Sequence, residues 1–212
     1  MMNLVTIDFE TYYDKDYSLS KLTTEEYVRD PRFEIIGVGV KYNNADTEWA
    51  SGTHAQIQEY LTDSFDWQDS MLLCHNTMFD GAILNWKLGI TPRVYADTMC
   101  MARALHGVET SASLRAVAER YGVGQKGIEV LNAKGKKRSD FSDSELDKYG
   151  DYCVNDVNLT YELFKKMGKY IPRKEFKLID LTLRMFVCPS LHLDVELLNQ
   201  HLAETKARKE KL

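Results

Sequence analysis

The stretch that decides the fold is residues 4–11, which read Leu-Val-Thr-Ile-Asp-Phe-Glu-Thr. Apolar and polar residues alternate along it, and this alternation predicts a strand because successive side chains of a strand point to opposite faces. Asp8 and Glu10 then lie on the same face as Thr6. Two neighbouring carboxylates repel each other, and a divalent cation bound through oxygen relieves that repulsion. A solvated strand end that carries two acids is the alternative interpretation.

Composition limits the class of protein. The chain has 212 residues, of which 44% are hydrophobic and 11% aromatic, and this is enough to form the core of one sizeable domain. The first residues show no basic segment followed by a long apolar run, and no apolar stretch approaches bilayer length. We therefore expect a soluble, cytoplasmic protein without a membrane partner. The formal net charge of -5 does not decide whether nucleic acid is a partner.

Cysteine and histidine residues are scattered along the chain. No C-x-x-C pair and no H-E-x-x-H motif occurs. The pattern favours reduced, mostly buried thiols, and it argues against a metal ion held by nitrogen or sulfur. The cysteines are Cys74, Cys100, Cys153 and Cys188.

The pattern after the first strand predicts a β-meander followed by alternating strands and helices. The β-branched run 35–42 and the segment 46–50 flank an Asn-Asn turn, and with the first strand they form the meander. The apolar run 71–74 suits a buried strand, and 94–96 is expected to be the next one. Capping residues and apolar periodicity predict helices at about 23–30, 53–61, 77–86, 98–105, 114–121, 142–167, 174–187 and after 194.

Three polar side chains on the predicted helices are candidates to join the two acids of the first strand. Asp80 lies in the first turn after the strand 71–74, where interaction with the helix dipole is the simpler explanation. Asn76 or Thr77 can cap that helix. Tyr152 and Asp156 are four residues apart and point from one side of the long helix that a Ser-x-x-Glu capping box opens.

Two further polar features have expected roles. Asp97 is expected to cap a helix rather than to take part in chemistry. The loop 124–139 carries basic residues between glycines, and although such loops are usually solvated, it is the best candidate for contacts to a phosphate backbone. These basic residues are Lys126, Lys134, Lys136, Lys137 and Arg138.

Taken together, three short motifs resemble those of the DEDD superfamily of 3′-5′ exonucleases. They are, in chain order, Asp8-x-Glu10, Asn76-x-x-x-Asp80 and Tyr152-x-x-x-Asp156. The resemblance covers about residues 3–168, and three motifs in the expected order are far more specific than one. The motifs resemble those of the tyrosine branch of the superfamily. The histidine branch has a His five residues before its last Asp, and this chain has Asp151 at that position.

The resemblance implies an α/β fold of ribonuclease-H type, with a mixed five-stranded sheet flanked by helices and a C-terminal helical extension. It implies two divalent ions, Mg²⁺ or Mn²⁺, with Asp8 bridging them, Glu10 and Asp156 holding one and Asp80 supporting the other. Tyr152 is expected to orient the attacking water. The expected substrate contacts, which include three residues of the basic loop, are Thr11, Asn76, Phe79, Lys136, Lys137 and Arg138.

The reaction that the resemblance implies is removal of nucleoside 5′-monophosphates from the 3′ end of single-stranded DNA or a frayed primer. Within the superfamily, the chain resembles the proofreading domain of a phage or bacterial family-A DNA polymerase, and the run 183–194 resembles the passage toward the polymerase domain. We therefore expect an exonuclease domain at 1–170 and a helical extension at 171–212, in a bacterial or phage-infected cell. The sequence leaves two alternatives open: the chain is a piece of such a polymerase, or it is a stand-alone nuclease.

Two other functions compete with this hypothesis. One is trimming of RNA 3′ ends by the same chemistry. The other is a non-catalytic nucleic-acid-binding module that keeps the fold. The complete set of Asp8, Glu10, Asp80, Tyr152 and Asp156 argues against the module, because a protein without catalysis has no reason to hold four converging carboxylates.

Overall fold

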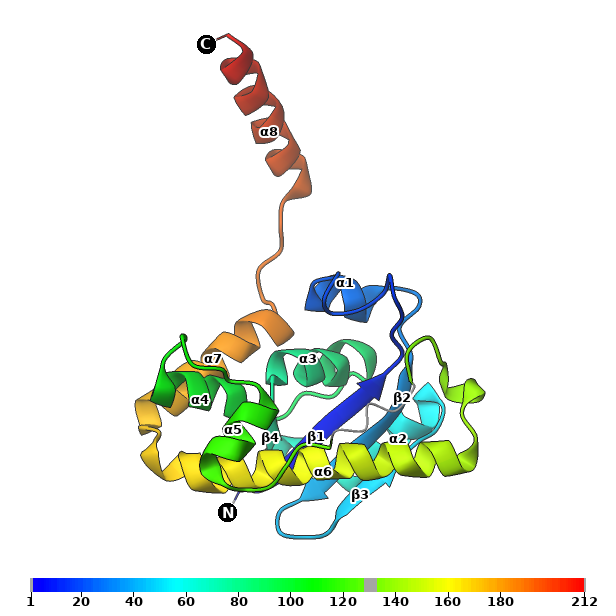
Figure 1. Cartoon of the computed structure of the whole chain (residues 1–212). Helices are drawn as coiled ribbons and strands as arrows, with labels where there is room; N and C mark the ends of the chain where they lie inside the picture. Colours follow the sequence, from blue (N-terminus) through cyan, green and yellow to red (C-terminus); the bar gives the residue numbers. More distant parts are fainter. Residues whose placement is uncertain (1, 128–132, 212) are drawn as a thin grey trace.

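The computed structural model of the protein describes residues 2–127 and 133–211. Its centre is a five-stranded sheet of order β3-β2-β1-β4-β5 (Figure 1). Strands β1 to β3 pair antiparallel, whereas β4 pairs parallel with β1 and with β5. The expected mixed sheet is therefore confirmed. The strands are β1 Asn3–Thr11, β2 Ile35–Tyr42, β3 Thr47–Ala50, β4 Ser70–Cys74 and β5 Val94–Asp97.

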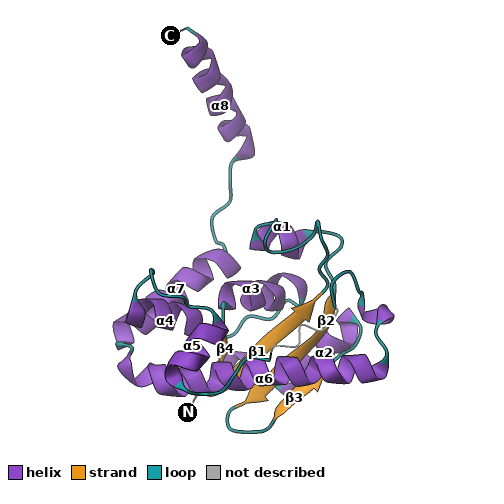
Figure 2. Ribbon diagram, viewed as in Figure 1, coloured by secondary structure: helices purple, strands orange, loops and turns teal. Residues whose placement is uncertain are grey.

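Helices surround this sheet (Figure 2). The α-helices are α1 Thr24–Arg29, α2 His54–Ser64, α3 Thr77–Ala82, α4 Thr98–His106, α5 Leu114–Tyr121, α6 Asp143–Met167, α7 Arg173–Val187 and α8 Val195–Glu210. Short 3₁₀ turns lie at Trp67–Asp69, Arg138–Asp140 and Gly168–Tyr170. Most expected helices are confirmed within two residues, but α2 continues three residues past the predicted end at 61. The predicted helix 77–86 is α-helical only to Ala82 and then widens into a π-helical turn, Ile83–Lys87.

Helix α6 lies across β1, β2 and β3 (Figure 1). Glycine allows the close approach: a Cβ on Gly39 of β2 would lie only 2.9 Å from the Cys153 sulfur. On the helix side, a Cβ on Gly150 would lie 2.5 Å from a ring carbon of Trp49 in β3. Because neither position has room for a side chain, α6 can pack directly on the sheet. This packing brings the middle of α6 next to the two acids of β1.

The C-terminal helices differ in how they contact the rest of the protein. Hydrogen bonds join helix α7 to it: the Tyr95 backbone N–H donates to Asp180 Oδ1 at 2.8 Å, the Trp86 indole N–H donates to the Val187 carbonyl at 2.7 Å, and the Arg184 guanidinium donates to the Arg93 carbonyl. Helix α8 has no buried residue and extends away from the sheet (Figure 1). The domain boundary at residue 170 stays a prediction. No helix in the described ranges is long and apolar enough to cross a membrane.

Candidate active site

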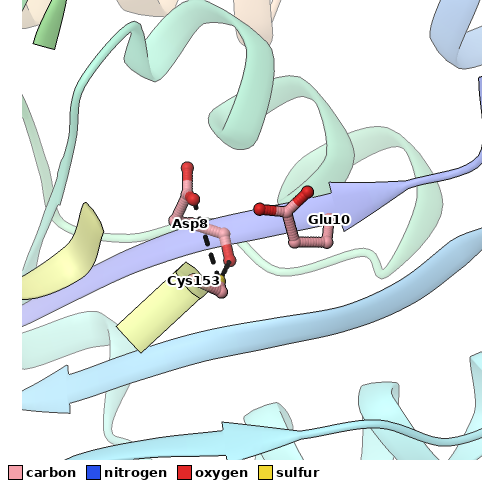
Figure 3. Close-up of side chains that lie close together, drawn as sticks. All are labelled: Asp8, Glu10 and Cys153. Atoms are coloured by element: carbon pink, nitrogen blue, oxygen red, sulfur yellow. Dashed lines mark hydrogen bonds between the residues drawn. The ribbon is translucent and has the colours of Figure 1, made fainter. Parts of the chain in front are cut away.

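The acids of β1 lie side by side, as their spacing predicts. Asp8, Glu10 and Cys153 each offer a ligand atom, and these atoms lie within 4.8 Å of one another (Figure 3). The Cys153 thiol comes from α6 and donates to the Asp8 backbone carbonyl at 3.2 Å, with a longer contact of 3.7 Å to Asp8 Oδ2. Helix α6 therefore covers the face of β1 that carries the acids.

Asp80 reaches the same place from α3. Strand β4 pairs with β1 only as far as Thr6, so the N–H of Phe9 finds no strand partner on that side. Asp80 Oδ1 accepts this N–H at 3.0 Å, and the Asp80 side chain is almost fully buried. Because β4 runs parallel to β1, the helix that follows it begins beside the carboxyl end of β1. The fold thus places Asp80 next to Asp8, and burial first and the charge of Asp8 second raise the Asp80 pKa.

Helix α6 supplies Asp156 and Tyr152, one turn apart, on the side that faces the cluster. Asp156 is 3% exposed. Its Oδ2 lies 2.6 Å from the ammonium of Lys126, whereas its Oδ1 is buried and has no hydrogen-bond partner among the described residues. Burial raises the pKa of Asp156, and the nearby Lys126 and Tyr152 offset part of this rise.

Burial raises the pKa of every carboxyl in the cluster, and repulsion by a neighbouring carboxylate adds to the rise for Asp8, Glu10 and Asp80. Burial first, and the charge of Asp156 second, raise the pKa of Asp8 to about 7. Burial and the charge of Asp8 raise the pKa of Glu10 to about 8. The pKa of Asp80 is raised well above its ordinary value, and burial raises that of Asp156 as well. The cluster is therefore short of positive charge at neutral pH.

The residues present fit a pair of divalent cations. Four carboxylates supply oxygen, which Mg²⁺ and Mn²⁺ prefer. The buried Asp156 Oδ1 is an acceptor without a donor, as expected of an atom whose partner is an ion. Cys153 is not expected to add a sulfur ligand, because burial and the charges of Asp8 and Glu10 raise the pKa of its thiol and keep it protonated.

The predicted substrate residues near β1 border a cavity of about 300 Å³. Glu10, Thr11 and Phe79 are among its lining residues, together with Leu19 and Tyr13. The Thr11 hydroxyl is hydrogen-bonded to the Tyr27 hydroxyl at 2.9 Å, so its side chain also has a structural role. Contact of these residues with a substrate stays a prediction.

Asn76 sits in a strained turn ahead of α3. Its φ is +82°, in the left-handed region, and its side chain makes no capping hydrogen bond. The expectation that Asn76 or Thr77 caps α3 with its side chain is therefore wrong. Asp97 Oδ1 instead accepts the Asn76 N–H at 3.1 Å, and Asp97 Oδ2 accepts the Thr77 N–H at 3.0 Å. Asp97 also caps α4, as predicted, so one carboxylate fixes the start of two helices.

Basic residues of the predicted phosphate-binding loop divide into two groups. Lys136 pairs with Glu145 at 2.7 Å, while the Arg138 side chain donates to the Ser51 hydroxyl at 3.0 Å. Lys137 lies 4.0 Å from Glu34, so these three basic residues have protein partners. Lys126, from the same loop, is the one whose charge reaches the acidic cluster. Nothing in the sequence distinguishes Lys126 from its basic neighbours.

Two residues of α6 at the site were not predicted from the sequence. Tyr149 lies beside Glu10 and offsets part of the rise that burial causes in the pKa of that carboxyl. Cys153 donates to Asp8. The periodicity of α6 places Cys153 toward the core, but it does not show which strand residues α6 meets.

The sequence matches the model of one protein family. A sequence model of the protein family described as 3′-5′ exonuclease matches residues 33–172. The matched range contains Asn76, Asp80, Tyr152 and Asp156, and it begins after β1. No curated protein matches the sequence.

Several solved structures share the fold. NrnC from Brucella melitensis bound to pGG has a TM-score of 0.63 and 14% identity, over 88% of this chain and 82% of that one. RNase D from Trypanosoma brucei in complex with RNA U12 has a TM-score of 0.65 and 12% identity, over 91% and 66%. A family B DNA polymerase from the archaeon Pyrobaculum calidifontis has a TM-score of 0.60 and 16% identity, over 90% of this chain but 27% of that one. At these identities the likeness establishes the fold alone.

The family match, the fold and the acidic cluster agree with one another. DEDD exonucleases use two divalent metal ions, and one structure of NrnC contains bound Mg²⁺. The family model covers more than half of the chain. The chain therefore belongs to the 3′-5′ exonuclease family of the DEDD superfamily.

Proposed function

We propose that the protein hydrolyses the 3′-terminal phosphodiester of single-stranded or frayed DNA and releases nucleoside 5′-monophosphates. The observation that carries the proposal is that Asp80 from α3 and Asp156 from α6 lie close enough to the β1 pair Asp8 and Glu10 for their charges to interact. Asp8 and Glu10 themselves have ligand atoms within 4.8 Å of each other, and the buried Asp156 Oδ1 has no hydrogen-bond partner among the described residues. A folded chain gains nothing from this repulsion unless cations neutralise it. Phosphodiester hydrolysis is the reaction that such a cluster supports in this family.

The four carboxylates divide between two ions in the proposal. Asp8 has Glu10, Asp80 and Asp156 as charged neighbours, so it is the residue suited to contact both ions. Glu10 and Asp156 complete one site and Asp80 supports the other. Two divalent ions, when bound, activate a water molecule and stabilise the leaving 3′ oxygen.

Tyr152 is proposed to orient the attacking water. Burial is the main cause that raises the pKa of Tyr152, so its hydroxyl keeps its proton at neutral pH. The hydroxyl lies next to Asp156, which is assigned to the site that would hold that water. It can therefore hold the water through a hydrogen bond without carrying charge.

Tyr152→Phe is expected to slow cleavage by about 10–100-fold, the range for loss of a group that supports a metal site. Affinity for Mn²⁺, measured by calorimetry, is expected to stay the same because no ligand is lost. Tyr161→Phe is the matched control, since Tyr161 is on the same helix and its hydroxyl is bonded to Asn44 instead. Equal rates for Tyr152→Phe and the control would remove Tyr152 from the mechanism.

The cavity beside Glu10 is proposed to hold the terminal nucleotide. Phe79 and Tyr13 give it aromatic walls on which a base can stack, and Thr11 lies beside Glu10 at its edge. The part of the strand behind the terminal nucleotide is proposed to contact Asn76 and the basic residues Lys136, Lys137 and Arg138. An unpaired terminus costs less to unstack into such a cavity than a paired one, so no base needs to be recognised.

The biological setting is proposed to be proofreading for a DNA polymerase. The run 183–194 supports it, and the family B polymerase shares the fold over a part of its length only. In this setting residues 1–170 form the nuclease and residues 171–212 lead toward a polymerase domain or subunit.

RNA trimming is the second candidate function, and the RNase D structure in complex with RNA favours it. The test is a time course on DNA and RNA strands of one sequence, each labelled at its 5′ end, with Mg²⁺. We expect the DNA strand to shorten faster. Faster shortening of the RNA strand would make RNA the substrate. Binding of either strand without shortening would indicate a non-catalytic module.

A further inference from the structure

Residues 124–127 lie along α6 at the turn that carries Tyr152 and Asp156. Gly124 allows the close contact, since its φ is +143° and a Cβ there would lie 2.9 Å from a methyl carbon of Leu159. The Asn155 amide donates to the Gln125 carbonyl at 3.2 Å. From one end to the other, the contacts pair Gly124 with Leu159, Gln125 with Asn155, Lys126 with Asp156 and Gly127 with Tyr152. The segment thus runs antiparallel to the helix.

Lys126 extends from this segment into the acidic cluster. Its side chain is 27% exposed, and its ammonium lies 2.6 Å from Asp156 Oδ2 and 5.3 Å from the centre of the Tyr152 ring. Burial lowers the Lys126 pKa, but the charge and hydrogen bond of Asp156, together with Tyr152, outweigh burial and raise the pKa overall, so the side chain stays charged. The positive charge offsets part of the rise that burial causes in the pKa of Asp8, Glu10 and Asp156. Lys126 therefore partly neutralises the cluster.

The same carboxylate is assigned to a metal ion. A divalent ion at Asp156 and an ammonium 2.6 Å from its Oδ2 repel each other, and the repulsion is strong because burial limits screening by water. The two cations therefore compete for Asp156.

We propose that Lys126 is the counter-ion of the acidic cluster in the metal-free protein, and that its pair with Asp156 opens when a divalent ion binds. The inference rests on the proposed function, because it takes Asp156 as a metal ligand. Lys126 then has two effects. It stabilises the fold when metal is absent, and it lowers the affinity for metal.

Calorimetric titration with MnCl₂ alone tests the competition without any measurement of cleavage. Lys126→Met removes the charge, Lys126→Gln removes the charge but keeps a polar group at the end of the side chain, and Lys126→Arg keeps the charge. We expect about tenfold tighter Mn²⁺ binding in the two neutral variants, within the range of coupling between interacting sites. Lys126→Arg is expected to resemble the wild type. The matched control is Lys134→Met, which removes the same charge from an exposed position outside the site.

Thermal unfolding provides the second measurement. In chelator, the neutral variants at Lys126 are expected to have lower melting temperatures than the wild type and the control. When Mn²⁺ is added, their melting temperatures are expected to rise by more than those of the wild type and the control. Unchanged or weaker Mn²⁺ binding in both neutral variants would overturn the counter-ion role while leaving the nuclease assignment intact. Absence of Mn²⁺ binding in the wild type would overturn the metal assignment and this inference together.

Discussion

Asp8→Asn is expected to lower the rate of 3′-end cleavage by about 1,000-fold or more while the protein stays folded. Asp8 is the carboxylate with charged neighbours in β1, α3 and α6, so its loss weakens both proposed ion sites. Metal ions contribute several kcal/mol to stabilisation of the transition state, and each 1.36 kcal/mol is about a factor of ten in rate. The fold is expected to tolerate the amide, because in the metal-free protein the charge of Asp8 is repelled rather than paired.

The rate is measured in single turnovers on a 5′-labelled DNA strand at saturating Mg²⁺. Asp63→Asn is the control, since Asp63 is an exposed acid on α2 and the substitution changes the net charge equally. Asp63→Asn is expected to keep the wild-type rate. A rate for Asp8→Asn within about tenfold of the wild type would mean that Asp8 does not hold the ions.

Metal-free protein is expected to lose several degrees of melting temperature between pH 5 and pH 8. In the folded chain the pKa of Asp8 is raised from 3.8 to about 7 and that of Glu10 from 4.5 to about 8. The folded state therefore binds more protons than the unfolded state in this range, and the free energy of unfolding falls as pH rises. A loss of about 1 kcal/mol corresponds to about 2–4 °C in a chain of this size.

Mg²⁺ is expected to recover this loss at pH 8, because the ions replace the protons that the carboxyls would otherwise hold. The measurement is thermal unfolding at both pH values, in chelator and in Mg²⁺. Asp8→Asn should show a smaller pH dependence than the wild type, and this difference isolates the cluster from other titrating groups. A wild-type melting temperature that does not depend on pH in chelator would contradict the raised pKa values.

Local patterns were sufficient to predict most of the fold. The alternation in residues 4–11 predicted the central strand with its two acids on one face, and the capping box at Ser142 predicted the start of α6. That Asp80 and Asp156 join Asp8 was predicted from the resemblance of the three motifs to those of the DEDD exonucleases, not from local pattern alone.

The remaining features depend on contacts between distant segments. Lys126 meets Asp156 because residues 124–127 lie on α6, and one basic residue in a glycine-rich loop gives no sign of this contact. Cys153 meets Asp8 because Gly39 lets α6 pack close to β2. Asp97 takes the place of the side-chain cap expected at Asn76. Strand β5 ends beside β4, so the Asp97 carboxylate reaches the first residues of both α3 and α4. Such contacts are properties of packing rather than of local sequence.

The most direct test of the central claim is a time course on single-stranded DNA labelled at its 5′ end, with and without Mg²⁺, separated on a denaturing gel. The account predicts a ladder of labelled strands that shorten from the 3′ end, release of nucleoside 5′-monophosphates, and an intact strand in chelator. Strands that stay full length in Mg²⁺ and in Mn²⁺ would contradict it, as would immediate release of the labelled nucleotide from the 5′ end.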